Sequence, residues 1–164
     1  MDMMLFIGID PGQSGALAVI GDDFVETVIP FSESAYRKTL LDLDAKRVMS
    51  DVKLFAVVEH VGPMPKQGVS STFKFGMNFG WIHGLLCAIG VPFELVRPQK
   101  WKKMFSCTSD KNTSIDVAQR MFPSVPLFAT PRCRKPHDGM AEALLMAEYA
   151  RRIWQAGDSP KMEA

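Results

Sequence analysis

Two short apolar runs, each ending in or followed by a carboxylate, constrain the fold of this chain more than any other feature. Asp10 comes directly after the run 4–9, and Glu59 ends the run 53–59. Apolar runs of this length without polar alternation are typical of strands that are buried on both faces. A glutamate at the end of such a strand has little structural purpose. An aspartate before a Pro-Gly pair would also be explained as a turn residue.

A second pair of acids lies at the start of a helical stretch from 138 to 155. Asp138 and Glu142 are four residues apart, and residues at this spacing share one face of a helix. Taken alone, the pair is explained equally well without a metal, as a capping aspartate and a surface glutamate, because negative charge is favoured at a helix N-terminus. Together with Asp10 and Glu59 it favours a metal site, since carboxylates that gather away from water repel one another.

Four carboxylates indicate Mg²⁺, a cation that prefers oxygen ligands and keeps several of its waters. Mn²⁺ is expected to substitute for it. Two such ions about 4 Å apart can clamp both sides of a phosphodiester displacement, with Asp10 as the natural bridging ligand. His137, directly before Asp138, is expected either to cap the helix or to position the attacking water or contact a phosphate. The residues therefore indicate a metal-dependent nuclease.

Five strands and five helices are expected along the chain. The strands span residues 4–9, 16–20, 24–29, 53–59 and 92–96, and the helices span 32–44, 71–89, 99–105, 113–122 and 138–155. Antiparallel strands come first and parallel ones follow, which predicts an α/β fold with a five-stranded mixed sheet flanked by helices. This order resembles the RNase H-like fold, in which the first and fourth strands are neighbours. Asp10 and Glu59 would then lie within reach of one metal ion.

A chain of 164 residues fits one domain, which we place at residues 1–156 with a flexible tail at 157–164. Its three cysteines form no C-x-x-C pair, so neither a zinc site nor a disulfide framework is indicated. No apolar run approaches the roughly 20 residues that cross a bilayer, and no secretory signal pattern opens the chain. We therefore expect a cytoplasmic protein with no membrane partner.

The net charge is +1, but the basic residues are concentrated in one part of the sequence, here called the basic half. Between Arg97 and Lys135 the chain carries nine basic residues against two acidic ones. A solvated helical surface would explain one such cluster, but beside an acidic metal site a polyanion-binding face is the favoured interpretation. The cationic candidates for DNA contact are Lys74, Lys100, Lys102, Lys103, Lys111, Arg134 and Lys135.

Aromatic residues near the start of the segment 71–89 suggest a DNA contact. Phe73 is the candidate for stacking on an unpaired base or wedging a junction open. Core packing better explains Phe75 and Phe79, and Trp101 is expected to be a packing anchor.

Three glycines recur every four residues in the same segment, at Gly76, Gly80 and Gly84. Each costs a helix about 1 kcal/mol relative to alanine. Such a stripe predicts a close neighbour, which is either the sheet beneath the helix or the same helix of a second subunit.

In order and spacing, these motifs resemble those of the RuvC Holliday-junction resolvases, particularly the phage-type, RuvC-like crossover-junction endonucleases. The resemblance covers residues 4–152 and is carried by Ile7-Gly8-Ile9-Asp10-Pro11-Gly12 with Ser14-Gly15, Val58-Glu59, Pro65-x-Gln67-Gly68 and the residues up to Gly76, Pro98-x-x-Trp101-Lys102-Lys103, and His137-Asp138-Gly139-x-Ala141-Glu142. It implies an RNase H-like nuclease that resolves four-way DNA junctions by paired symmetric nicks, in the cytoplasm of a bacterium or a phage-infected host cell. It also implies a homodimer built at the glycine-bearing helix, because a two-fold dimer supplies two symmetric sites.

The resemblance implies catalytic and metal-binding roles for Asp10, Glu59, Asp138 and Glu142. Lys111 matches a basic residue that family members place near the scissile phosphate. Many bacterial members space the last two site residues three apart and have a second Asp, whereas here Glu142 follows Asp138 by four residues. How metal binding is divided among these two acids and His137 is therefore left open.

Other interpretations remain at this point. The loop Gly8-Ile9-Asp10-Pro11-Gly12-x-Ser14-Gly15 also resembles the first phosphate loop of actin-like and sugar-kinase ATPases. Those proteins need two such domains, and this chain has room for one. We therefore expect no nucleotide cofactor here. Another RNase H-like nuclease, one that cuts RNA–DNA hybrids or flaps, would share the carboxylates without needing a symmetric dimer. A non-catalytic junction-binding module is disfavoured because all four acids are present.

Overall fold

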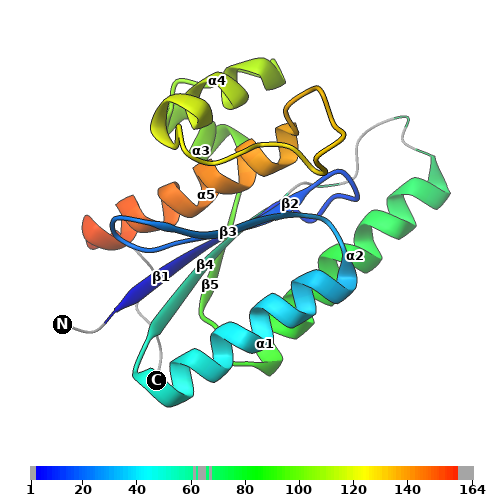
Figure 1. Ribbon diagram of the computed structural model, residues 1–164. Coiled ribbons are helices and arrows are strands. Elements are labelled where there is room, and N and C mark those ends of the chain that lie inside the picture. The colour runs from blue at the N-terminus through cyan, green and yellow to red at the C-terminus, as the bar shows by residue number, and fades with distance from the viewer. Residues whose placement is uncertain (1–2, 61, 63–65, 67, 159–164) are drawn as a thin grey trace.

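The sheet is built around β1 (Met4–Ile9), which lies at its centre in the computed structural model (Figure 1). The structure describes residues 3–60, 62, 66 and 68–158. The five strands are ordered β3-β2-β1-β4-β5. The other strands are β2 (Ala16–Ile20), β3 (Val25–Pro30), β4 (Lys53–Glu59) and β5 (Phe93–Val96). The first three strands pair antiparallel, whereas β4 runs parallel to both β1 and β5.

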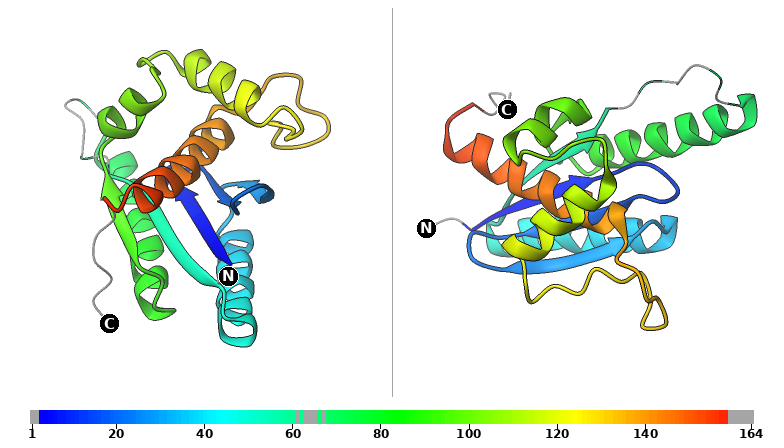
Figure 2. Two further views of the ribbon diagram at one scale, coloured as in Figure 1. Left: turned by 90° about the vertical axis from the view of Figure 1, so that its left-hand side faces the viewer. Right: turned by 90° about the horizontal axis from the view of Figure 1, so that it is seen from above.

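Helices cover both faces of the sheet (Figures 1 and 2). They are α1 (Glu33–Ser50), α2 (Val69–Ala88), α3 (Pro98–Met104), α4 (Lys111–Met121) and α5 (Asp138–Gln155). Alternate residues of β1 point to opposite faces, as the period of a strand requires. Phe6 packs in one apolar cluster with the core residues of α5, and its neighbours Leu5 and Ile7 pack in another with α1 and α2. The site described below lies on the α5 side.

Direct backbone contact between α5 and β1 depends on a missing side chain at Gly8. A Cβ at this position would stand 2.1 Å from the carbonyl oxygen of Ala143 and 2.4 Å from the nitrogen of Ala147. The helix therefore rests on the middle of the central strand without side chains between them. Small residues on the same helix face, such as Ala143 and Ala147, permit the same approach.

The predicted α/β fold and its mixed five-stranded sheet are confirmed, and element ends differ by a few residues from the expected ones. The largest difference is at α1, which continues to Ser50 instead of ending at residue 44. Arg47 pairs with Asp44 one turn earlier, and an ion pair at this spacing stabilises the last turns of the helix. Ser32 caps the start of α1, because its hydroxyl accepts the N–H of Ala35.

Two expectations fall mainly outside the described residues. These are the flexible tail, of which 159–164 is not described, and the Pro-x-Gln part of the motif at 65–67. Among the described helices, none combines the length and the apolar character that a membrane crossing demands.

Adding a methyl group at Gly8 should destabilise the protein strongly. Gly8→Ala forces the backbone of α5 away from β1, and overpacking of this kind costs about 3 kcal/mol when backbone atoms must move. Chemical denaturation followed by circular dichroism measures the change. Gly62→Ala is the matched control, because a Cβ at Gly62 meets no atom within 4 Å. Equal stability of Gly8→Ala and the wild type would contradict the direct contact.

Candidate active site at the ends of the central strands

The ends of β1 and β4 place the first two acids side by side. Asp10 directly follows β1 and Glu59 is the last residue of β4, in a parallel register that pairs Ile9 with Val58. The turn after β1 holds Asp10, whose Oδ1 accepts the N–H of Gly12 at 3.1 Å. The predicted neighbourhood of Asp10 and Glu59 therefore follows from the pairing of their strands.

The first turn of α5 brings the other two acids to the same place. A Cβ at Gly139 would lie 2.3 Å from the carbonyl oxygen of Ser14, so the start of α5 rests against the turn that follows β1. Glu142 is only 6% exposed, which excludes an ordinary surface acid. Asp138 is more open to solvent, at 28% side-chain exposure.

Burial and mutual repulsion shift the proton affinity of the strand-end acids. Burial raises the pKa of Asp10 to about 6, against the lowering effect of the Gly12 N–H, and the charges of Glu142 and Asp138 raise it further. Burial also raises the pKa of Glu59 to about 7, with a further contribution from the charge of Asp10. The four acids are therefore close enough to repel one another, and a bound cation would relieve that repulsion.

Two lysines from the basic half compensate the negative charge. Lys102 Nζ lies 2.9 Å from Glu142 Oε1, and Lys111 pairs with Asp138. The desolvation of Asp138 acts to raise its pKa, but the hydrogen bond and the charge of Lys111 outweigh it and hold that pKa below the ordinary value. Both lysines were predicted as DNA contacts, and the structure adds their ion pairs with the acidic cluster.

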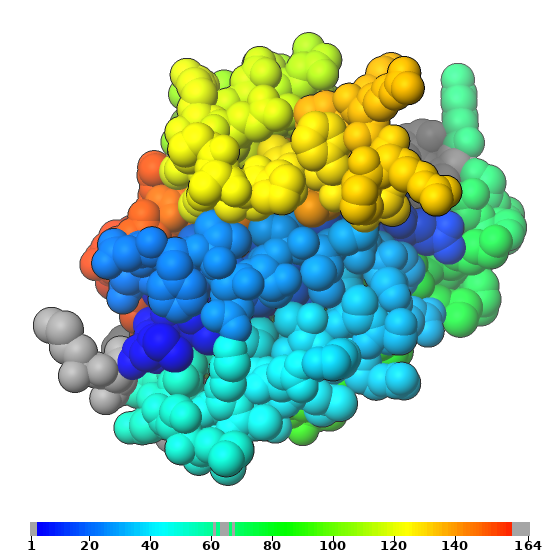
Figure 3. All heavy atoms as spheres, in the orientation of Figure 1, coloured from blue at the N-terminus to red at the C-terminus, as the bar shows by residue number. Residues whose placement is uncertain are grey.

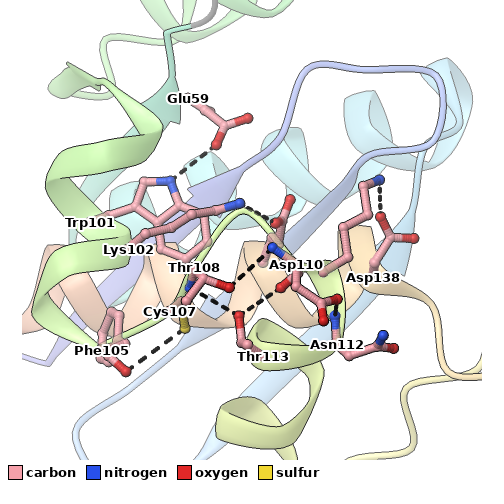
Figure 4. Close-up of polar contacts among 12 residues, drawn as sticks. Glu59, Trp101, Lys102, Phe105, Cys107, Thr108, Asp110, Asn112, Thr113 and Asp138 are labelled. Atoms are coloured by element: carbon pink, nitrogen blue, oxygen red, sulfur yellow. Dashed lines mark hydrogen bonds and ion pairs between the residues drawn. The ribbon is translucent and has the colours of Figure 1, made fainter.

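Trp101 makes a contact that the sequence analysis missed. Its indole Nε1–H donates to Oε1 of Glu59 at 3.0 Å, and both side chains are buried (Figure 4). The expected role of Trp101 as a packing anchor is also correct, since the residue is fully buried in the α5-side core. The spacing of Pro98-x-x-Trp101-Lys102 after a strand was the available signal, but spacing alone does not reveal the partner of an indole.

The donor set fits a hard divalent cation. All four acids offer oxygen ligands, as Mg²⁺ or Mn²⁺ requires. Glu142 Oε1 is buried and accepts no hydrogen bond from the described residues, because its ion pair with Lys102 lacks hydrogen-bond direction. Within that same part of the chain, no three acidic, histidine or cysteine side chains stand at the spacing of a preformed metal site. A cation would therefore have to draw side chains such as Glu142 inward from their lysine partners.

His137 caps α5, one of the two roles expected for it. Its Nδ1 accepts the N–H of Met140 at 3.1 Å. A neutral imidazole that accepts at Nδ1 carries its proton on Nε2. In this tautomer the Nε2–H side of the ring is a hydrogen-bond donor.

The remaining DNA-contact candidates lie at the surface. Lys103, Arg134 and Lys135 are exposed, and Lys74 is exposed on α2. Lys100 is engaged with Glu94 at 3.0 Å. Phe73 is 68% exposed near the start of α2, as a base-contacting aromatic requires.

The glycine stripe on α2 does not face the sheet. A Cβ built at Gly76, Gly80 or Gly84 meets no atom within 4 Å. The first explanation for the stripe, close packing on the sheet beneath, is therefore wrong, because these positions lie on the outer side of the helix. Met77 on the same side is 58% exposed.

A separate cleft of about 730 Å³ lies between the turn joining β2 to β3 and the segment after α4, with Glu148 and Arg151 in its lining. Figure 3 shows this segment (yellow) lying along the hairpin strands (blue). Glu148 is buried and doubly paired with Arg151 and Arg152, so its charge is satisfied. None of the four clustered acids lines this cleft.

Removing the charge of Glu59 should stabilise the fold in the absence of divalent ions. Because burial raises its folded-state pKa from 4.5 to about 7, its ionisation opposes folding at high pH and not below pH 4.5. Glu59→Gln should therefore raise the unfolding free energy by on the order of 2 kcal/mol at pH 8. The gain should shrink toward pH 5.

Denaturant unfolding in EDTA at the two pH values measures this difference. Glu33→Gln, which changes an exposed acid of α1, is the control and should show little change at either pH. A Glu59→Gln protein less stable than the wild type at pH 8 would mean that the carboxylate is not under electrostatic strain.

Comparison with known proteins relates this geometry to one fold. No protein-family model and no curated protein sequence matches the chain. Among solved structures, RuvC from T. thermophilus in complex with a Holliday junction substrate matches with a TM-score of 0.59 and 16% identity, over 94% of this chain and 96% of that chain. A Thermus thermophilus RuvC structure matches with a TM-score of 0.58 and 18% identity, over 94% and 97% of the two chains. The chain therefore has the RNase H-like fold in the form that RuvC adopts.

Proposed function

We propose that this protein is a Mg²⁺-dependent endonuclease that resolves four-way DNA junctions by paired symmetric nicks. The observation that carries the proposal is the convergence of four acids from β1, β4 and α5 on one end of a RuvC-type sheet, with lysines beside them. The structural likeness to a protein that was solved with a Holliday junction agrees with this choice of substrate.

The acids would hold the metal through Asp10 and Glu59 at the strand ends and through Asp138 and Glu142 on α5. When bound, divalent cations activate the attacking water and stabilise the leaving 3′ oxygen. The chain itself orients the scissile phosphate. Lys111 is 64% exposed at its side chain and would transfer from Asp138 to a phosphate oxygen when DNA arrives.

The surface beside the acids suits a phosphate backbone. A groove of about 430 Å³ runs along α3 and the following loop, and Lys102, Lys103 and Thr108 contribute to its lining. It starts at the lysine that pairs with Glu142. Arg134 and Lys135, in the loop before α5, add two exposed positive charges close in sequence to Asp138. Contacts of this kind position DNA without reading its sequence.

The outer side of α2 is the proposed dimer interface. Gly76, Gly80 and Gly84 leave room for close approach, and exposed Val69 and Met77 supply apolar surface. A helix with apolar residues all round is normally covered on every side. A second copy of α2 would cover it and place two sites in two-fold symmetry, as paired nicks require.

Cleavage assays test the proposed activity. Wild-type protein with Mg²⁺ should nick a labelled synthetic four-way junction at symmetric positions, and EDTA should abolish the reaction. Asp10→Asn and Glu59→Gln should each lower the rate at least ~100-fold, because loss of one charge in a metal site removes several kcal/mol of transition-state stabilisation. Both variants should still bind the junction, since the lysines are unchanged.

Linear duplex, RNA–DNA hybrid and ATP serve as comparison substrates in the same assay. If only the RNA–DNA hybrid is cut, the protein is a ribonuclease and the proposal of junction resolution is wrong. Hydrolysis of ATP would favour the phosphotransferase interpretation. Junction binding without cleavage in either Mg²⁺ or Mn²⁺ would leave a non-catalytic binding module.

A bulky residue in the glycine stripe should break the dimer. Gly80→Leu places a side chain where the second helix must approach, so sedimentation velocity should show a dimer for the wild type and a monomer for the variant. Ala45→Leu adds the same side chain at an exposed position of α1 and should leave the dimer intact. A wild-type monomer at micromolar concentration, or a dimeric Gly80→Leu protein, would exclude this interface.

A further inference from the structure

We infer that Trp101 is a positioning residue, whose indole N–H holds Glu59 in the orientation that binds the metal. This inference rests on the proposed function, because it concerns the metal site of the same nuclease. It is built on one contact, the 3.0 Å hydrogen bond from Trp101 Nε1 to Glu59 Oε1. The close-up of the site shows the indole directed at the carboxylate from α3 (Figure 4).

The hydrogen bond leaves one carboxylate oxygen for a ligand. An indole is a donor only, so Trp101 occupies Oε1 of Glu59 with a single fixed hydrogen bond. In the described part of the chain, no donor reaches the other oxygen, Oε2. The carboxylate is therefore turned so that one oxygen is held by the protein and the other remains for a cation or its water.

The surroundings of Trp101 make this donor rigid. The residue is fully buried in the core cluster that contains Phe105 and Leu144, so its ring cannot rotate to another partner. A buried Trp101 without an acceptor would also leave a polar N–H unsatisfied, which is costly in a protein interior. Glu59 and Trp101 therefore fix each other, and α3 is tied to the end of β4 through them.

Lys102, which follows Trp101, also contacts an acid of the cluster. Lys102 pairs with Glu142, and its ammonium lies 5.2 Å from the centre of the Trp101 ring. Two consecutive residues of α3 thus contact two different acids of the cluster, one through a fixed N–H and one through a mobile charge. A purely structural anchor would need only the ring of Trp101, whereas this geometry also uses its N–H.

Groups that orient metal-binding carboxylates commonly change metal affinity by 10–100-fold when removed. Trp101→Phe keeps an aromatic ring and deletes the N–H, so it should weaken Mn²⁺ binding to the DNA-free protein about tenfold. Isothermal titration calorimetry measures the affinity. Trp154→Phe removes an indole that packs against Phe55, away from the acids, and should bind Mn²⁺ within twofold of the wild type.

A spectroscopic readout separates positioning from packing without relying on the variant's stability. The chain has three tryptophans, so its indole N–H groups give separate NMR signals, which single Trp→Phe variants assign. The Trp101 signal should shift on addition of Mg²⁺ and in Glu59→Gln, while the signals of Trp81 and Trp154 should move little.

The outcomes distinguish this inference from the proposed function. Mn²⁺ binding to the wild type, with unchanged affinity in Trp101→Phe or an unshifted Trp101 signal, overturns the positioning role and leaves the nuclease proposal standing. A wild-type protein that binds neither Mn²⁺ nor Mg²⁺ overturns both. A tenfold loss in Trp101→Phe together with the selective signal shift supports the positioning role.

Discussion

The contact between α5 and the backbone of β1 is the constraint on which the rest of this structure depends. Because Gly8 has no side chain, the helix lies directly on the central strand, and its first turn reaches the turn that follows that strand. This places Glu142 beside Asp10 without any long loop to position it. The acids are therefore held by regular elements and not by flexible segments, which is the more precise way to build a site. The same contact therefore packs the core and positions the acids of the candidate site.

The acidic cluster opposes folding, and the structure shows how part of that cost is offset. Burial raises the pKa of Asp10 and of Glu59, so their ionised forms are disfavoured in the folded chain. Lys102 and Lys111 pair directly with the two acids of α5. Within the described residues, the strand-end acids form no such ion pair: they accept N–H donors from Gly12 and Trp101, and the lysine charges act on them only as weaker contributions. The strand-end pair thus keeps the stronger demand for a cation. A site with its charge already neutralised on every acid would gain little from binding one.

Sequence reasoning recovered the strands and the positions of the four acids from local patterns, whereas the neighbouring of the first and fourth strands came from the resemblance to the RNase H-like fold. Apolar runs identify buried strands, and the position of Glu59 at the end of one is unusual for a purely structural residue. Contacts between distant segments were not recoverable in the same way. The partner of the Trp101 indole and the side of α2 that carries Gly80 depend on how helices are oriented after packing. The end of α1 was placed too early, and the ion pair between Arg47 and Asp44 belongs to the helix turns beyond the predicted end.

The two faces of the sheet divide the tasks of the molecule. The α5 face carries the acids and, through α3, the groups that orient and neutralise them. On the opposite face, α2 buries Ile82 and Leu86 against the sheet and leaves its glycine side uncovered. The start of α2 also exposes Phe73. A partner bound along α2 would therefore contact neither α3 nor α5 directly, and association could change without disturbing the carboxylates. One direct route for coupling between the two is β4, whose last residue is Glu59 and whose buried residues share an apolar cluster with Ile82.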